Sequence, residues 1–195
     1  MMQQSSAKRA SIIAVTAALY TVFFFLSFAI GVPTFTVLFL PIILLGVFPL
    51  WFGWSGLVGS MIGAFIGGIY VEGLPLYLAW VEITTAIVIY GLNWLLTPKS
   101  AAQAKTKKGI IILASIYALT LFVGTCFILW QFSAVGLFPA EVAWPLLPGT
   151  FALNLPIVLI ACPALIRAVS PKLKSWAMYS GNFAEWRSRH SKKPT

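Results

Sequence analysis

The sequence predicts an all-α integral membrane protein with six transmembrane helices and with both termini in the cytoplasm. The chain is 60% hydrophobic and 9% charged, whereas a soluble domain carries about 25% charged residues. Apolar runs repeat along it at lengths near the roughly 20 residues that a membrane-spanning helix needs. All 13 Lys and Arg residues fall on one side of the six-span topology or at its edge. This distribution follows the positive-inside rule and predicts a multi-pass protein of the cell membrane.

The first apolar run extends from Ala10 to Ile30. It is longer than the roughly 7–15-residue core of a cleaved secretory signal, so we expect it to be retained as a span. Ala10, Ala14 and Ala18 repeat every fourth residue and therefore share one helix face. Small residues at this spacing let a second helix approach closely. The pattern predicts a helix-packing face, whose partner lies either in this chain or in another subunit.

The second run, Phe35 to Phe52, contains Pro41 and Pro49. Proline removes a helical hydrogen bond, so we expect this span to be kinked or broken. The third run, from Gly53 to Tyr70, carries glycines at positions 59, 63 and 67. This spacing favours tight helix packing inside the bundle over direct contact with a ligand.

The rest of the chain predicts three further spans and a tail. The spans are separated by a polar, lysine-rich linker and by a loop that contains glycine and proline. Residues 1–170 then form the transmembrane domain, and residues 171–195 form a basic cytoplasmic tail suited to the membrane interface. The three spans cover Leu76 to Leu96, Gly109 to Phe132 and Trp144 to Val169.

Glu82 is an acidic residue inside a predicted membrane span, where acids are not expected. It lies about 9 Å below the outer end of its span, at ~1.5 Å per residue. An ionisable group at such depth costs roughly 2.5–3.5 kcal/mol on insertion scales. No other charged residue lies within a span at this level, whereas Glu72 and Glu141 fall in outer loops. Glu82 is either neutral and hydrogen-bonded in the bundle or lines a site open to the outside, and we favour the second interpretation.

Other polar and aromatic residues are predicted near the same depth. Asn154 either makes a helix–helix hydrogen bond or joins the site, and Gln131 ends the fifth span nearby. A single tryptophan is more typical of the membrane interface than of a ligand site. Together these residues predict an outer cavity for a small, flat, polar or cationic organic molecule. The tryptophans assigned to it are Trp80, Trp130 and Trp144.

The sequence contains no pattern typical of catalysis or of a metal site. Cys126 and Cys162 lie in apolar runs without a second ligand nearby, and His190 lies in the polar tail. No phosphate-binding loop, Ser/His pair or acid pair suited to hydrolysis is found. We therefore expect no enzymatic activity, cofactor or metal, and the charge arrangement disfavours a nucleic-acid partner.

Three segments in order resemble one transporter family. They are Ala14 to Tyr20 (AVTAALY), Leu40 to Gly46 (LPIILLG) followed by the glycine-rich third run, and Leu147 to Gly149 (LPG). The combination is similar to the substrate-binding S component of energy-coupling factor (ECF) vitamin transporters, over nearly the whole chain.

The resemblance implies high-affinity uptake of one vitamin-like micronutrient or precursor. It implies a membrane coupling subunit and two cytoplasmic ATPases as partners, with Ala14 and Ala18 as the docking face for the coupling subunit. It also implies that the loop Gly31 to Thr34 helps to form the substrate cavity.

The substrate and two other functions stay open. With Glu82 and no basic residue in the outer cavity, the residues favour a cationic or neutral heterocycle, thiamine-like or base-like, over an anion. One alternative function is a structural or assembly membrane protein without a small-molecule ligand. The other is a small membrane enzyme that acts on lipid, for which the sequence shows no catalytic constellation.

Overall fold

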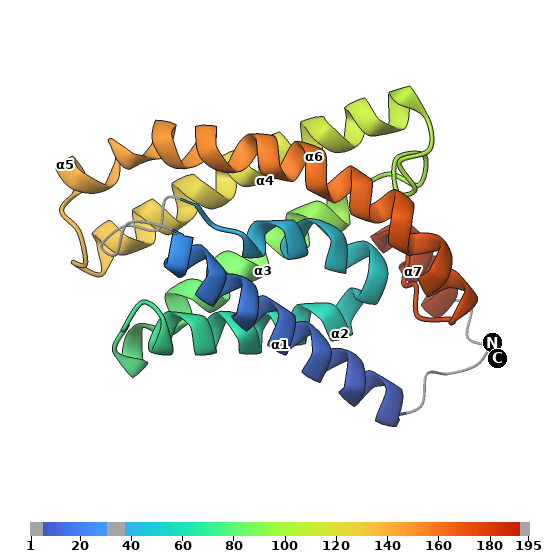
Figure 1. The fold of residues 1–195 in the computed structure, drawn as a ribbon, viewed down its shortest axis with the longest axis horizontal. Coiled ribbons are helices and arrows are strands. Elements are labelled where there is room, and N and C mark those ends of the chain that lie inside the picture. Colours follow the sequence, from blue (N-terminus) through green and yellow to red (C-terminus); the bar gives the residue numbers. More distant parts are fainter. Residues whose placement is uncertain (1–5, 31–37, 192–195) are drawn as a thin grey trace.

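The computed structural model describes residues 6–30 and 38–191, and this part of the chain is helical without strands. Five segments are long and apolar enough to cross a membrane, and they lie along the long axis of the molecule (Figure 1). The predicted loop Gly31 to Thr34 falls outside the described residues. The helices are α1 (Ser6–Ile30), α2 (Pro41–Tyr70), a 3₁₀ turn η1 (Leu76–Leu78), α3 (Trp80–Leu96), α4 (Lys107–Ala134), α5 (Ala140–Ala143), α6 (Leu146–Ser175) and α7 (Phe183–Ser191).

Helix α2 holds both the second and the third predicted run. It is broken at Gly53, whose φ of 52° and ψ of −130° are not helical, and its two arms run in opposite directions (Figure 1). The first arm, residues 41–52, is about 18 Å long at ~1.5 Å per residue. This length is shorter than the roughly 30 Å hydrocarbon core of a bilayer. The structure therefore has five long apolar helices in the described residues, where the sequence predicts six spans.

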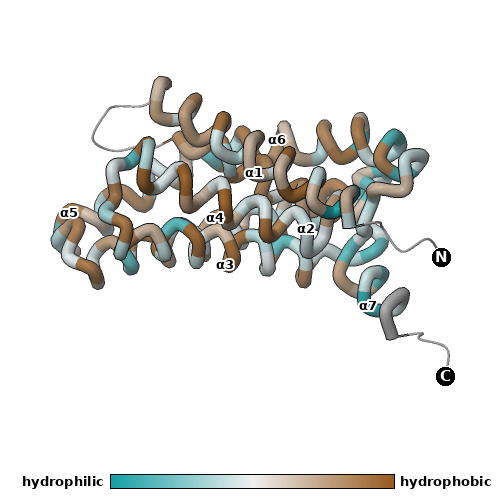
Figure 2. Tube along the Cα trace, turned by 90° about the horizontal axis from the view of Figure 1, so that it is seen from below, coloured by the Kyte–Doolittle hydropathy of each residue, from teal (hydrophilic) through white to brown (hydrophobic). Residues whose placement is uncertain are grey.

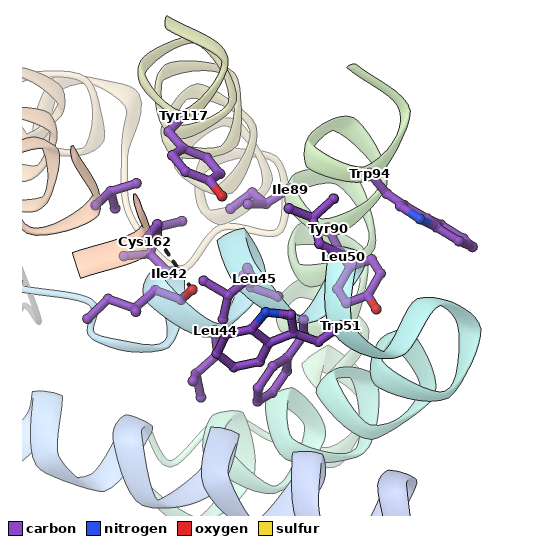
Figure 3. Packing of buried hydrophobic residues seen from close by; sticks show 14 of the residues in the cluster. Ile42, Leu44, Leu45, Leu50, Trp51, Ile89, Tyr90, Trp94, Tyr117 and Cys162 are labelled. Carbon is purple, nitrogen blue, oxygen red and sulfur yellow. Dashed lines mark hydrogen bonds between the residues drawn. The ribbon is translucent and has the colours of Figure 1, made fainter. Parts of the chain in front are cut away.

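The first arm of α2 is the core of the molecule. It is buried on all sides, as expected for a helix that is apolar around its whole circumference. Pro49 leaves the Leu45 carbonyl without its helical donor, and Asn93 Nδ2 donates to that carbonyl at 3.2 Å. The hydroxyl of Tyr117 donates to the carbonyl of Gly46 at 3.0 Å. Figure 3 shows Leu45 surrounded by core side chains from several helices.

The segment that follows α6 supplies hydrogen-bond partners to α2 at the break near Gly53. The carbonyls of Leu50 and Trp51 accept hydrogen bonds from the backbone N–H groups of Gly181 and Ser180, both at 2.8 Å. The Tyr90 hydroxyl donates to the carbonyl of Gly53. Because buried backbone groups need partners, these contacts supply what the interrupted helix lacks.

The predicted packing role of the glycine stripe is confirmed, and its partner is α1. A Cβ at Gly63 would lie 2.6 Å from Tyr20 Cβ, and one at Gly59 would lie 2.7 Å from the carbonyl oxygen of Ile13. A Cβ at Gly67 would lie against the ring of Phe24, 2.6 Å from its Cγ. The inner face of α1 is thus the face of Thr16, Tyr20 and Phe24, all of which are buried.

The two ends of the molecule differ in charge. The start of α1, the linker between α3 and α4, and α7 lie at one end, while α5 and the α2–α3 turn lie at the other (Figure 1). Lys8 Nζ donates to the Trp176 carbonyl at 2.8 Å, and the Tyr179 hydroxyl donates to the Ala102 carbonyl at 3.1 Å. Polar residues gather near α7, whereas the long helices are apolar along most of their length (Figure 2). The basic linker and tails therefore form a basic end, and Glu72, Glu82 and Glu141 belong to an acidic end.

Candidate functional site

A cavity of about 280 Å³ lies towards the acidic end of the bundle. Its volume is near the lower end of the roughly 300–1,000 Å³ typical of small-ligand pockets. Its walls come from α3, α4 and α6, with smaller contributions from α1, the segment before α2 and the loops at the acidic end. The lining residues are mainly apolar, and the polar ones are Glu72, Glu82, Thr85, Thr125, Thr150 and Asn154.

Glu82 lines this cavity from the first turn of α3 and is only 4% exposed. The second arm of α2 approaches it closely, since a Cβ at Gly68 would lie 3.1 Å from Glu82 Cγ. A glycine at this position therefore makes room for the acidic side chain.

Glu72 comes from the tight turn that ends α2. Its N–H donates to the Gly67 carbonyl at 3.2 Å, and the Leu74 N–H donates to the Gly68 carbonyl at 2.9 Å. Gly73 has a φ of 71°, a left-handed conformation that glycine adopts without steric cost. This turn folds the chain back, so that Glu72 lines the same cavity as Glu82.

The carboxyl groups of Glu72 and Glu82 lie close enough to interact with each other. Oε2 of Glu72 is buried and has no hydrogen-bond partner among the described residues. Burial raises the pKa of Glu72 from its usual 4.5 to about 7, while the interaction with Glu82 acts in the opposite direction. Two adjacent carboxylates cannot both ionise without repulsion, so such a pair shares one proton. The site therefore offers a partly unsatisfied acid pair to whatever enters the cavity.

Glu72 is the cavity-lining acid that sequence reasoning missed. The sequence places it in an outer loop, away from the depth of Glu82. The available signal is the shortness of the segment between α2 and α3, which holds the end of one helix near the start of the next. Which way the side chain points depends on the turn at Gly73, and residue spacing does not encode that.

Asn154 also lines the cavity, but much of its hydrogen-bonding capacity is already used. Its Oδ1 accepts from the N–H of Phe39 at 2.8 Å, and its Nδ2 donates to the Thr150 carbonyl at 2.8 Å. The first contact positions Phe39, whose side chain forms part of the wall. Asn154 therefore holds the segment that leads into α2 against α6.

Gln131 lies behind the cavity wall. Its Oε1 accepts from the Thr85 hydroxyl at 2.8 Å, and its Nε2 donates to the Thr84 hydroxyl at 2.6 Å. Thr85 lines the cavity, whereas Gln131 does not. The glutamine thus joins α4 to α3 and orients a cavity-lining hydroxyl.

The three predicted tryptophans lie away from the cavity lining. Trp80, Trp130 and Trp144 are 44%, 54% and 41% exposed. Exposed tryptophans on apolar helices are typical of a membrane-interface belt. The aromatic walls come from four phenylalanines that the sequence does not single out: Phe28, Phe39, Phe132 and Phe138.

Ala14 and Ala18 are on the exposed side of α1, as is Ala10. The second arm of α2 covers the opposite side of the helix, which carries Thr16 and Tyr20. The alanine face is therefore unused within the described part of the chain.

Chemically, the cavity combines apolar walls with two acids, and its lining in the described residues contains no lysine, arginine or histidine. Among residues 6–30 and 38–191, no group of three metal-ligating side chains is found. Such a cavity is suited to an organic molecule with an apolar body and hydrogen-bond donors.

Comparisons with known proteins leave the family open. No family model matches this sequence, and no curated protein or solved structure matches it.

Proposed function

We propose that this chain is the membrane substrate-binding subunit for uptake of a vitamin-like micronutrient or precursor, working with an ATP-driven coupling module. The observation that carries the proposal is the cavity of about 280 Å³ with its acid pair at the end of the bundle opposite the basic segments. Under the positive-inside rule the basic end faces the cytoplasm. The cavity then lies in the outer half of the membrane, where a substrate enters from outside.

In this proposal the chain crosses the membrane region six times and both termini are cytoplasmic. The two arms of α2 are the second and third crossings. The first arm does not need the full bilayer length, because other helices rather than lipid surround it. Broken helices are tolerated at membrane depth where protein covers them.

The coupling partners are proposed from the exposed face of α1. A membrane coupling subunit would pack on Ala14 and Ala18, where small side chains allow close approach of a second helix. Two cytoplasmic ATPases would complete the module. The resemblance of Ala14 to Tyr20 to the alanine motif of ECF S components supports this assignment.

A ligand search on the purified chain tests the binding role. The chain is purified alone in detergent and denatured, and the small molecules released are identified by mass spectrometry. Thermal shift against a vitamin panel provides an independent readout. We expect one vitamin-like molecule in stoichiometric amount, or clear stabilisation by one panel member. An empty protein that no member stabilises would contradict the proposal and favour a structural or assembly role.

The docking face is tested by Ala14→Trp and Ala18→Trp. The bulky ring should block close helix approach, so co-purification with the coupling subunit should be lost while ligand binding is retained. Leu119→Trp is the matched control, because Leu119 is an apolar residue on α4 that is 52% exposed. Unchanged co-purification of both alanine variants would contradict the assignment.

A further inference from the structure

We propose that the ligand of this cavity is an organic cation with N–H donors, such as an amidinium or protonated amine on a flat apolar body. We further propose that it binds by displacing the proton shared by Glu72 and Glu82. The inference rests on the proposed function, since it names the substrate class of the same cavity.

The geometry of the acid pair is the first argument. Both glutamates line the cavity, and they contact each other across the turn between α2 and α3. If the pair were only a structural link between these two elements, one shared proton would satisfy it. Instead, Glu72 Oε2 is buried without a partner in the described part of the chain, which costs free energy until a donor arrives. A ligand with N–H groups supplies that donor.

The cavity lining argues against other ligand classes. No basic side chain of the described residues lines it, so an anion would find no opposite charge, and the acid pair would repel it. Ca²⁺ takes roughly six to eight oxygen ligands, more than two carboxylates provide. The remaining walls are largely leucine, isoleucine and phenylalanine, which suit the apolar body of an organic cation.

The charge balance is the second argument. Above about pH 7, where Glu72 is ionised, the pair holds one proton and one negative charge before binding. After binding, two carboxylates surround one N–H cation, and the displaced proton leaves to solvent. The net charge of the buried site is the same in both states, so the exchange avoids placing additional charge in a low-dielectric environment.

Few other ionisable groups face the pair. Tyr20 of α1 lies close enough to both carboxyl groups to interact with them electrostatically. Helices α4 and α6 contribute no titratable side chain to the lining, and neither does the described segment before α2. The proton that is exchanged therefore belongs to Glu72 and Glu82.

The test uses three probes of nearly the same shape and different charge: benzamidinium, benzamide and benzoate. Each is added at millimolar concentration to the purified full chain, and binding is measured by thermal shift and by calorimetry in buffers of different ionisation enthalpy. We expect benzamidinium to stabilise the protein most, with release of up to one proton per bound cation. Its affinity should rise between ~pH 6 and ~pH 8, because Glu72 ionises across this range and the cation then has one proton fewer to displace.

Glutamine variants distinguish the contribution of the two cavity acids from that of the other acidic residue at this end. Glu72→Gln and Glu82→Gln should each weaken benzamidinium binding by roughly tenfold or more, because a hydrogen bond to a charged group is lost. Proton release should also differ from that of the parent, because each variant keeps only one of the two carboxyl groups. Glu141→Gln removes an acid from the same end but outside the cavity lining, and it should bind as the parent does.

Several results would overturn the inference. They are equal stabilisation by benzamide or benzoate, no effect of benzamidinium, or unchanged binding to both cavity variants. A released native ligand that is neutral or anionic, and that both variants still bind, would overturn the cation assignment and leave the uptake role standing. An empty chain that does not associate with a coupling subunit would contradict the uptake role, whatever the probes do.

Discussion

At the scale of single residues, the contact between Glu72 and Glu82 has the widest consequences. Without a partner, Glu82 would be an isolated acid in an apolar helix. A protein avoids the free-energy cost of burying such a charge by pairing the acid or by protonating it. Glu72 supplies the pairing partner from a loop that the turn at Gly73 folds over the helix end. The result is a pair that is sensitive to pH near neutrality.

The first prediction is that the protein loses stability as pH rises through about 7. The pKa of Glu72 is about 7 in the folded protein and 4.5 when exposed. Between these values the unfolded chain releases the proton and the folded chain keeps it, so the free energy of unfolding falls with rising pH. At ~1.4 kcal/mol per pKa unit, this loss is at most on the order of 3 kcal/mol.

Melting temperatures measured from ~pH 5 to ~pH 8 check this dependence. Glu72→Gln keeps a neutral side chain of the same size at every pH, so its melting temperature should vary less and exceed the parent's at the alkaline end. Glu141→Gln serves as the control and should retain the parent's slope. A parent protein that becomes more stable above neutral pH would contradict the prediction.

At the scale of elements, the pairing of α1 with the second arm of α2 depends on glycine. Gly59→Ala places a methyl group against Thr16 and 2.7 Å from the Ile13 carbonyl oxygen. The two helices must then separate, and we expect a loss of about 1–3 kcal/mol in stability. Gly91→Ala on α3 is the control, because a Cβ there meets nothing within 4 Å.

Thermal unfolding of the two alanine variants gives the readout. Gly91→Ala should be neutral or stabilising by roughly 0.5–1 kcal/mol, since alanine favours the helix. If Gly59→Ala melted at the same temperature as Gly91→Ala, the close contact between α1 and α2 would be wrong.

The segment after α6, which donates hydrogen bonds to α2 at its break, is held in place by Asn182. Its Nδ2 donates to the Thr97 carbonyl at 3.1 Å, and its Oδ1 accepts from the Glu185 N–H at 2.9 Å, which caps α7. Asn182→Ala should therefore loosen this segment, with a cap loss of about 1 kcal/mol. The amides of Ser180 and Gly181 should exchange faster with deuterium, because their hydrogen bonds to α2 open more often.

Asn182→Asp is the matched variant for this prediction. Aspartate still caps α7 but cannot donate to the Thr97 carbonyl, so its exchange rates should lie between those of the parent and the alanine variant. Parent-like exchange in the alanine variant would mean that the tail is held by other contacts, such as the ring packing of Trp94 with Phe183 and Trp186.

At the scale of the whole molecule, the separation of charge predicts its orientation in the membrane. Tyr77 is 75% exposed beside the acidic end, and Ser100 is exposed in the basic linker. With Cys126 replaced by alanine, Tyr77→Cys should react with a membrane-impermeant maleimide on intact cells. Ser100→Cys should react only after permeabilisation, because the positive-inside rule predicts that the basic end faces the cytoplasm.

The cysteine-labelling experiment carries its own control. The parent with Cys126→Ala retains Cys162, which is fully buried, so it should remain unlabelled under both conditions. Labelling of Ser100→Cys on intact cells would indicate the opposite orientation, with the cavity on the cytoplasmic side. That result would contradict uptake from outside.

Hydropathy, segment length and charge along the chain predict the helical class, the apolar segments and the segregation of charge. These features depend on the transfer free energies of neighbouring residues, which can be summed along the sequence without knowledge of the fold. The same holds for Glu82 as an unusual acid and for the glycine stripe as a packing surface, because spacing along one helix is set by its geometry.

Only the tertiary structure decided how these parts meet. It brought Glu72 to Glu82, placed four phenylalanines rather than the three tryptophans around the cavity, and turned Thr16 and Tyr20 inward while Ala14 and Ala18 stayed exposed. It also folded α2 at Gly53 into a buried and a glycine-rich arm. The physical reason is that such contacts join residues far apart in the chain. Their geometry depends on turn dihedrals and on competition among packing partners, neither of which is encoded in hydropathy or spacing.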